Sequence, residues 1–312
     1  MPYTKLVVHI DGTYSTVDSV CVKNNLVIVT GSRLRVARVK EEWYEDVHDP
    51  EPIIKTLINL EPRPDIFTFW QRLPETTPRY NYYKEWEPIA ALPVKSYADW
   101  FQNQIGQDTR KLIRRAQRKG CVVRPCTFDE ELIKGMERIF NETPIRQGRR
   151  FWHYGKDVET IKREFSRYLF REQILGAYYH DELIGFIFLA DAGKYGYLGQ
   201  IISRVEHRDK YPNNALMDKA VQIAEERKIP FLVYAYWARG GLAEFKRRNG
   251  FQKIMLPRYY IPLTSRGAIA LKLHLHHSLR ELIPEKVISH LRTIRGKWYG
   301  LRYGHGIANK NT

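Results

Sequence analysis

The sequence predicts an α/β protein, of the α+β type, in which a mixed central sheet is flanked by helices. The second half carries the clearest pattern, because three strand-like segments between Ile174 and Ser203 are separated by the turns His180-Asp181 and Ala192-Gly193. A helix, a strand, a helix and further strands then follow up to Tyr259, as is typical of a sheet with helices packed on it. The 312 residues are enough for two units.

Residues 1–88 predict a smaller sheet unit. Turn residues divide the stretch from Lys5 to Val39 into short, mostly antiparallel strands. We expect a helix over Pro52–Leu60, and the aromatic run Ile66–Trp70 has the composition of a buried strand. Because Pro74–Pro88 holds several prolines and tyrosines, it is expected to be a connector.

Residues 89–263 predict a complete α/β unit. Ser96 is a suitable N-cap for a long helix that continues to Lys119 and that Gly120 ends. The other elements are expected in this order: strand Cys121–Pro125, helices Asp129–Asn141 and Val158–Phe170, the three strands, helix Asn213–Arg227, strand Phe231–Tyr236, helix Leu242–Arg248, and strands near Phe251 and Tyr259. Residues 264–312 are expected to be a basic helical C-terminal extension.

Composition argues for a protein of the cytoplasm without a metal or a disulfide. No apolar run approaches the roughly 20 residues that span a bilayer, and the N-terminus lacks the pattern of an export signal. Cys21, Cys121 and Cys126 lack the spacing and partners of a zinc site, so we expect plain thiols. The histidines at 274, 276 and 277 have no partner at ligand spacing in the sequence, so no metal site is predicted.

The net charge of +16 indicates an anionic partner. A nucleotide phosphate, tRNA, another nucleic acid and an anionic membrane surface remain open, and so does a basic surface that is only solvated. In the C-terminal extension, Leu271, Leu275, Leu279 and Leu282 recur at helical spacing among basic residues. An amphipathic helix packed on the protein is expected there, with contact to a membrane surface or RNA as the alternatives.

Three motifs resemble those of a known family. The run 206–216 is similar to the pyrophosphate loop of GNAT acyltransferases, although Pro212 and Asn214 replace the usual glycines, and 242–251 resembles the family's later helix that ends in Gly-Phe. Residues 109–123 resemble the R-x-x-x-R-x-A-x-x-x-G-V pattern of FemABX-like transferases, which consist of two GNAT units in tandem. The resemblance implies a GNAT fold, with residues 1–88 as a shortened first unit.

The donor is expected at the start of the helix near Asn213. A helix start offers unpaired backbone N–H groups and the positive end of a dipole, and nearby basic side chains add charge for a diphosphate. A simple helix start is the alternative. By resemblance, the reacting carbonyl lies between the strands near Gln200 and Tyr234, with backbone N–H groups after Ile201 as oxyanion donors. The expected donor contacts are Ile202, Arg208, Lys210, Asn213, Asn214, Ala215 and Phe245.

The acceptor is expected near two basic segments. Arg110 and Arg114, one helical turn apart, are suited to a carboxylate or phosphate unless they lie on a solvated face. The loop from Arg146 to Tyr154 mixes basic and aromatic residues, a composition suited to gripping a substrate. The expected substrate contacts are Arg110, Arg114, Arg146, Trp152, Tyr154 and Gln200.

Transfer to an amine needs a base, donors to polarise the carbonyl, and an acid for the leaving group. We predict Tyr236 as the acid and Glu206 as the base, with His153 as an alternative base. Each has an ordinary structural alternative: an aromatic rim for Tyr236, an ion pair with Arg208 for Glu206, and packing for His153.

The sequence thus predicts an acyl-CoA-dependent N-acyltransferase that uses acetyl-CoA or another acyl-CoA as co-substrate and an amine-bearing acceptor. The alternative on the same fold is an aminoacyltransferase of FemABX type that takes its donor from aminoacyl-tRNA. From a different class, a noncatalytic basic binding protein on a GNAT scaffold also fits, since a fold does not establish an activity.

Overall fold

The computed structural model describes residues 2–10, 13–146, 149–166, 169, 171–238 and 240–277. The chain forms two compact units, and one of them is discontinuous: it contains the chain up to Pro88 and again from Met255, whereas the other contains Ile89–Ile254. The division falls within two strands, β6 (Tyr83–Pro93) and β14 (Gln252–Pro262). Among the described helices, none is both long enough and apolar enough to cross a bilayer.

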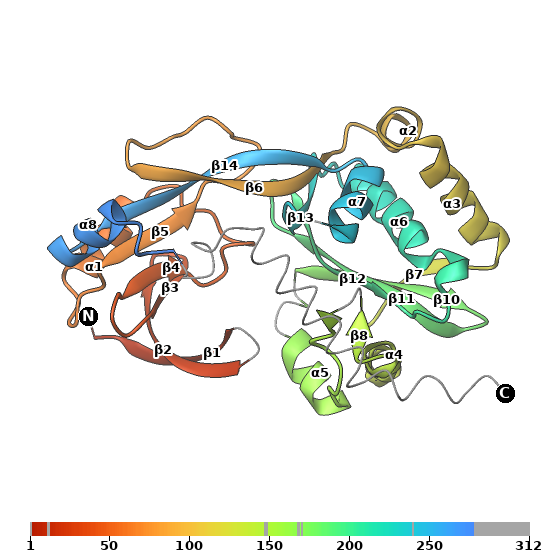
Figure 1. The fold of residues 1–312 in the computed structure, drawn as a ribbon, viewed down its shortest axis with the longest axis horizontal. Helices are drawn as coiled ribbons and strands as arrows, with labels where there is room; N and C mark the ends of the chain where they lie inside the picture. The colour runs from red at the N-terminus through yellow and green to blue at the C-terminus, as the bar shows by residue number, and fades with distance from the viewer. Residues whose placement is uncertain are drawn as a thin grey trace. The chain divides into compact units, whose positions relative to one another are not determined.

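The first unit is a sheet with one crossover helix (Figure 1). Its strand order is β1 (Thr4–Ile10), β2 (Thr13–Val22), β3 (Asn25–Thr30), β4 (Val36–Val39), β5 (Ile66–Trp70) and β14. Neighbours are antiparallel except β4 and β5, which are parallel because the chain returns through α1 (Glu51–Ile58). Ile53 and Leu57 of α1 pack with Phe67 and Phe69 of β5 in the core of this unit. The early strands, the helix and the aromatic strand lie where the sequence predicts them.

Two segments of this unit differ from the expectation. The second half of the predicted connector Pro74–Pro88 is strand, because β6 begins at Tyr83. The segment from Met255, which we expected in the second unit and the extension, belongs to the first unit. There β14 pairs with β5, and α8 (Ser265–Lys272) buries Ala270 and Leu271 with Ile66. The rest of the extension, 278–312, with Leu279, Leu282 and the predicted membrane or RNA contact, lies outside the described residues.

The second unit is a sheet with helices on both faces (Figure 1). Its strand order is β6, β13 (Phe231–Tyr236), β12 (Gly196–Ser203), β11 (Glu182–Asp191), β10 (Glu172–Tyr179) and β7 (Val122–Cys126). One face carries α3 (Gln107–Arg118), α6 (Pro212–Glu226) and α7 (Gly241–Arg248), and the other carries α4 (Glu130–Asn141) and α5 (Val158–Phe165). Strands β10 and β11 are buried on both faces, which explains their nearly continuous apolar sequence.

The long helix expected from Ser96 to Lys119 is broken. Ser96 does cap a helix start, since its hydroxyl accepts the Asp99 N–H at 3.0 Å. However, the turn α2 (Tyr97–Asp99) passes into a π-helical turn, η1 (Trp100–Gln104), and the chain is extended at Ile105 before α3 begins. The break lets Trp100 enter the core, where its indole N–H donates to the Asn249 carbonyl at 2.9 Å.

Candidate functional site

The two parallel strands in the second unit separate partway along their length. β12 and β13 pair at Gly196 with Leu232 and at Tyr197 with Val233. Beyond those pairs β12 continues beside β11 and β13 continues beside β6, so the two strands diverge. The divergence begins just before Gln200 and Tyr234, where the sequence predicts that the two strands split.

A β-bulge lies on the β12 side of the split. Ile187 of β11 faces Ile201 and Leu189 faces Leu198, so Gly199 and Gln200 together oppose one residue of β11. A bulge leaves a backbone group outside the ladder, free for a ligand. In addition, the Gln200 Oε1 atom is buried without a hydrogen bond to any described residue. This stretch therefore offers an unpaired backbone group at the bulge and, in Gln200 Oε1, an acceptor for an N–H or O–H group of a ligand, slightly upstream of the predicted position after Ile201.

On the β13 side, a lysine is buried at the end of the strand. The Lys246 side chain of α7 is almost completely excluded from solvent, and its Nζ atom donates to the carbonyls of Tyr234 at 2.5 Å and Tyr236 at 2.7 Å. The ammonium also lies 4.4 Å from the centre of the Tyr234 ring. Burial lowers the pKa of Lys246 to about 8. The two carbonyls use two of the three ammonium protons.

The residues that the sequence predicted at the end of β13 and in α7 differ in how deeply their side chains are buried. Tyr236 ends β13 with an exposed side chain, while its carbonyl holds Lys246. Tyr234 is less exposed, and burial raises the pKa of its phenol. Ala235 between them has a φ of 50°, a left-handed conformation that interrupts the regular strand. Phe245 packs against the core of the unit. Phe245 was predicted from the sequence, whereas its neighbour Lys246 was not.

The loop from β12 to α6, expected to bind a diphosphate, uses most of its own N–H groups. The Glu142 carboxylate accepts the N–H groups of Val205 at 2.5 Å and Glu206 at 2.9 Å. The loop's own carbonyls accept further N–H groups, from Arg208, Lys210, Tyr211, Asn214 and Ala215. Pro212 has no N–H to offer. Within 205–215, the N–H groups of His207, Asp209 and Asn213 donate to no described residue and could serve a ligand.

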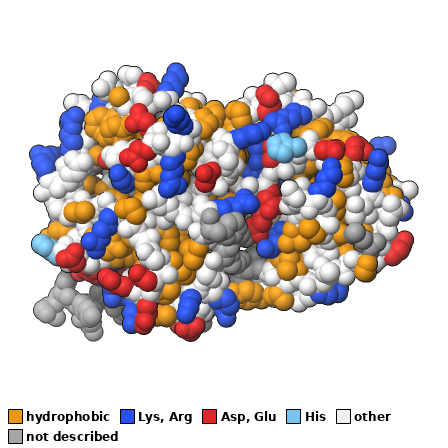
Figure 2. Space-filling view, turned by 180° about the vertical axis from the view of Figure 1, so that it is seen from behind, with side chains coloured by type: hydrophobic (Ala, Val, Ile, Leu, Met, Phe, Trp, Pro, Cys, Tyr) orange, Lys and Arg blue, Asp and Glu red, His pale blue; other side chains and the backbone are white. Residues whose placement is uncertain are grey.

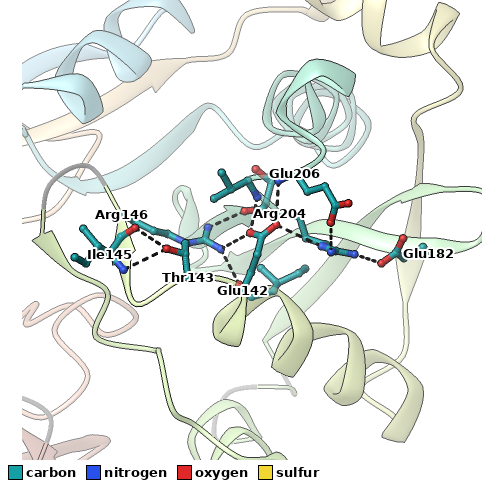
Figure 3. Close-up of polar contacts among 10 residues, drawn as sticks. Glu142, Thr143, Ile145, Arg146, Glu182, Arg204 and Glu206 are labelled. Carbon is teal, nitrogen blue, oxygen red and sulfur yellow. Dashed lines mark hydrogen bonds and ion pairs between the residues drawn. The ribbon is translucent and has the colours of Figure 1, made fainter. Parts of the chain in front are cut away.

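Glu142 is the centre of an ionic network at this loop (Figure 3). It accepts a hydrogen bond from Arg146 Nη2 at 3.3 Å and lies 3.6 Å from Arg204 Nε. Arg204 also pairs with Glu182 of β11 and with Glu206. Glu206, the predicted base, is thus bound by Arg204 rather than Arg208. Nothing in the sequence pointed to Glu142, which follows the last residue of α4 and lies far from the loop along the chain.

Arg146 holds backbone carbonyls and is not free to grip a substrate in this arrangement. Its Nη1 donates to the Ser203 carbonyl and its Nη2 to the Ile139 carbonyl, both at 2.7 Å. Burial lowers the pKa of Arg146, Glu142 opposes that shift, and Arg208 adds to it by repulsion. The side chain therefore connects the end of α4 to the end of β12.

The two basic residues expected at the donor differ in availability. Arg208 is exposed and forms no ion pair with a described residue, whereas Lys210 pairs with Asp209 at 3.0 Å and lies over the Tyr179 ring. Lys119 of the segment after α3 reaches the same Asp209 oxygen at 3.2 Å. On the face that Figure 2 shows, Lys and Arg are interspersed with Asp and Glu and do not form one continuous basic field.

The two arginines of α3 are not equivalent. The Arg110 Nη1 atom donates to the carbonyls of Phe101, Gln102 and Ile105 at 2.8 to 3.0 Å, and so caps the end of the π-helical turn. Arg114 lies over the Phe101 ring, 5.5 Å from its centre. One arginine of the Arg-rich helix motif, Arg110, therefore has a structural role.

The aromatic loop after α4 places His153 inside and its neighbours outside. His153 is buried and stacks on Phe140 with the ring centres 4.3 Å apart. Burial, with repulsion from Lys156 and Arg146, lowers the pKa of His153 to about 3. Trp152 and Tyr154 are exposed, and Lys156 Nζ lies over the Trp152 ring. His153 is therefore a neutral packing residue near neutral pH, while the exposed rings remain available to a ligand.

Solved structures share this fold. No family model and no curated protein matches the chain. A crystal structure of FemX is similar with a TM-score of 0.55 and 13% identity, covering 83% of this chain and 89% of that one. The C-terminal domain of a putative lysylphosphatidylglycerol synthetase from Agrobacterium fabrum has a TM-score of 0.55 and 12% identity, covering 82% and 87%. L-PGS from Bacillus licheniformis has a TM-score of 0.55 and 13% identity, covering 78% and 83%. The chain has the FemABX-like GNAT fold.

Proposed function

We propose that the protein is a GNAT-fold acyltransferase that takes an aminoacyl group from aminoacyl-tRNA and passes it to an amine in the split between β12 and β13. The observation that carries the choice of donor is the loop from β12 to α6, whose N–H groups of Val205 and Glu206 are held by the Glu142 carboxylate.

A coenzyme A diphosphate bound in the GNAT manner needs several converging N–H groups at a helix start. Here Pro212 offers none, Asn214 and Ala215 both donate to the Tyr211 carbonyl, and Glu142 places a negative charge at the start of the loop. A diphosphate would compete with that carboxylate for the N–H groups and be repelled by it. An aminoacyl ester needs no such cradle, because the anionic backbone of tRNA can be bound by basic side chains elsewhere.

The chemistry proposed for the split is one displacement. The amine nitrogen attacks the ester carbonyl and forms the carbon–nitrogen bond. The carbon–oxygen bond to the ribose then breaks, and a proton from the amine is transferred to the ribose oxygen. We assign the stabilisation of the developing negative charge to the backbone N–H groups of the bulge at Gly199 and Gln200 and to the cation of Lys246. Tyr236, exposed at the end of β13, is the proposed acid for the leaving oxygen. We assign no base role to His153, because its pKa of about 3 leaves it a poor proton acceptor.

An acyl-CoA-dependent N-acyltransferase is the second candidate. Arg208 favours it, because this exposed cation lies just before α6 and forms no ion pair with a described residue. The unused N–H of Asn213, the second residue of α6, could also meet a phosphate oxygen.

Thermal denaturation distinguishes the candidates, because a ligand that binds the folded chain raises its melting temperature. We expect bulk aminoacylated tRNA to raise the melting temperature at low salt, less so at high salt, and acetyl-CoA to leave it unchanged. A shift with acetyl-CoA that persists at high salt would replace the proposal with the second candidate. No shift with either would favour a noncatalytic binding protein.

A transfer assay then tests the chemistry. Loss of labelled amino acid from tRNA is followed with wild type and with Lys246→Met, in the presence of a panel of amines. We expect the variant to keep its tRNA-induced shift and to lose most of its transfer rate. Lys219→Met serves as the control, since Lys219 is a partly exposed lysine of α6 that contacts Gln222. Equal transfer rates in all three proteins would show that Lys246 has no part in the reaction.

A further inference from the structure

Four potential metal ligands meet in the first unit. Glu85 of β6 and three histidines of the turn after α8, His274, His276 and His277, each present one ligand atom, and all four atoms lie within 4.8 Å of one another. No partner for these histidines could be predicted from the sequence, because Glu85 lies far from them along the chain. The pairing of β14 with β5 and the docking of α8 bring the histidine turn to β6.

The turn that carries the histidines is compact and held by its own backbone. His274 has a φ of 54°, a left-handed conformation, and its N–H donates to the Leu271 carbonyl at 3.1 Å. The Leu275 N–H donates to Ala270 at 2.8 Å. This reversal, immediately after the last turn of α8, lets three side chains within four residues point toward one carboxylate.

The distances from Glu85 to the three histidines are close to the ligand separations of a tetrahedral metal site. Glu85 Oε1 lies 3.0 Å from His276 Nε2, 3.1 Å from His277 Nε2 and 3.8 Å from His274 Nδ1. In a tetrahedral zinc site with bonds of about 2.0 to 2.1 Å, neighbouring ligand atoms are about 3.3 Å apart. The three separations from Glu85 fall on both sides of that value, and all four ligand atoms lie within 4.8 Å of one another, so metal binding would draw the more distant ligand atoms closer together.

The surroundings also suit a metal site. Tyr83 donates its hydroxyl proton to Glu85 Oε1 at 3.0 Å, the kind of outer contact that orients a ligating carboxylate. His276 is nearly completely buried, with its ring against Tyr260 at 4.7 Å between centres, whereas His274 is more than half exposed. The exposed side provides an entry path for the ion, and the buried side fixes the geometry.

We propose that Glu85, His274, His276 and His277 bind one divalent transition-metal ion, zinc in the first place. Three imidazoles and one carboxylate are ligands that zinc accepts, and four protein ligands make a closed, structural site. The metal would join β6 to the turn after α8 and so connect residues that are distant in the sequence. This inference does not depend on the proposed transferase activity.

The experiment uses the full chain without a histidine tag, treated with a chelator and then titrated with Zn²⁺ in equilibrium dialysis with elemental analysis. We expect one zinc ion per chain and a higher melting temperature when it is bound. The partly exposed ligands are changed one at a time, as His274→Ala and His277→Ala, because these variants leave the buried His276 in place. Each should weaken zinc binding more than about 100-fold, since loss of even an outer-shell partner costs about 10- to 100-fold.

Two controls make the result specific. His48→Ala removes an exposed histidine of the same unit, which contacts Asp46, and should bind zinc like wild type. Co²⁺ in place of zinc should give the visible absorption of a tetrahedral site without a thiolate band, which excludes Cys21 as a ligand. Absence of zinc binding by wild type, unchanged binding in His274→Ala and His277→Ala, or a thiolate band with Co²⁺ would each overturn the proposal.

Discussion

The buried ammonium of Lys246 predicts a stability that rises with pH. Burial lowers its pKa from 10.5 to about 8, so between those values the unfolded chain binds more protons than the folded chain. Stability therefore increases as the pH rises through this window. Below pH 8 both states are protonated, and the folded chain bears the full cost of burying the charge.

The size of the effect follows from the two pKa values. The cost of the charge is about 3 kcal/mol near about pH 7.5 and about 1 kcal/mol near about pH 9.5. Wild type should thus gain about 2 kcal/mol over this range relative to Lys246→Met, which carries no titrating group there. Comparison with the variant removes the contribution of tyrosines and cysteines that titrate in the same range.

Urea unfolding at the two pH values, followed by tryptophan fluorescence and circular dichroism, measures the difference. Lys219→Met should retain the wild-type slope. If wild type and Lys246→Met respond equally to pH, the ammonium is not held in the folded chain as described, and the reasoning is refuted. The same titration should lower the transfer rate of wild type as the pH passes 8, because the cation beside the split is lost while the fold becomes more stable.

Three further substitutions test the structure. Glu142→Ala leaves two loop N–H groups without their acceptor and removes the carboxylate that forms ion pairs with Arg146 and Arg204, and should lower the free energy of unfolding by about 3 kcal/mol and speed amide exchange at Val205 and Glu206. Arg110→Met removes the donor to three carbonyls and should cost about 1 to 3 kcal/mol in urea unfolding, with Arg114→Met, which removes only a ring contact, costing less. Gly267→Ala places a Cβ atom 2.0 Å from the Asp65 carbonyl oxygen and should cost at least about 2 kcal/mol, whereas Gly106→Ala meets no atom within 4 Å and should be nearly neutral; equal melting temperatures for these two would contradict the docking of α8.

The sequence predicted the regular parts of the fold because their patterns are local. β13 lies at its predicted bounds, and the meander β10 to β12 follows its turn residues. The strand β6 was missed because Pro88 and the charged residues before it suggest a connector, whereas its contacts with β14, the Arg258–Glu87 ion pair and the Tyr83–Tyr260 ring contact, are long-range. The break after Trp100 was missed because the apolar spacing continues across it, and the deciding contact, from Trp100 to Asn249, is long-range.

The site was harder to predict because its parts come from distant segments. The loop at 206–216 has the position of an anion site, but Glu142, which occupies two of its N–H groups, comes from the end of α4. Lys246 had one local signal: it lies four residues after Leu242, on the inward side of α7, where a lysine is unusual. The histidine turn was visible in the sequence, and only its partner Glu85 was not.

The discontinuous first unit has a consequence for how the chain folds during synthesis. Every strand of the second sheet leaves the ribosome before β14 is complete, whereas the first sheet lacks one strand until then. During that interval β5, whose five residues are all buried in the finished protein, has an open edge of unpaired backbone groups and exposed phenylalanines. The first unit is thus the first to be synthesised and the last to be completed. We expect chaperone binding or aggregation at the open edge of β5 when translation stalls before Met255.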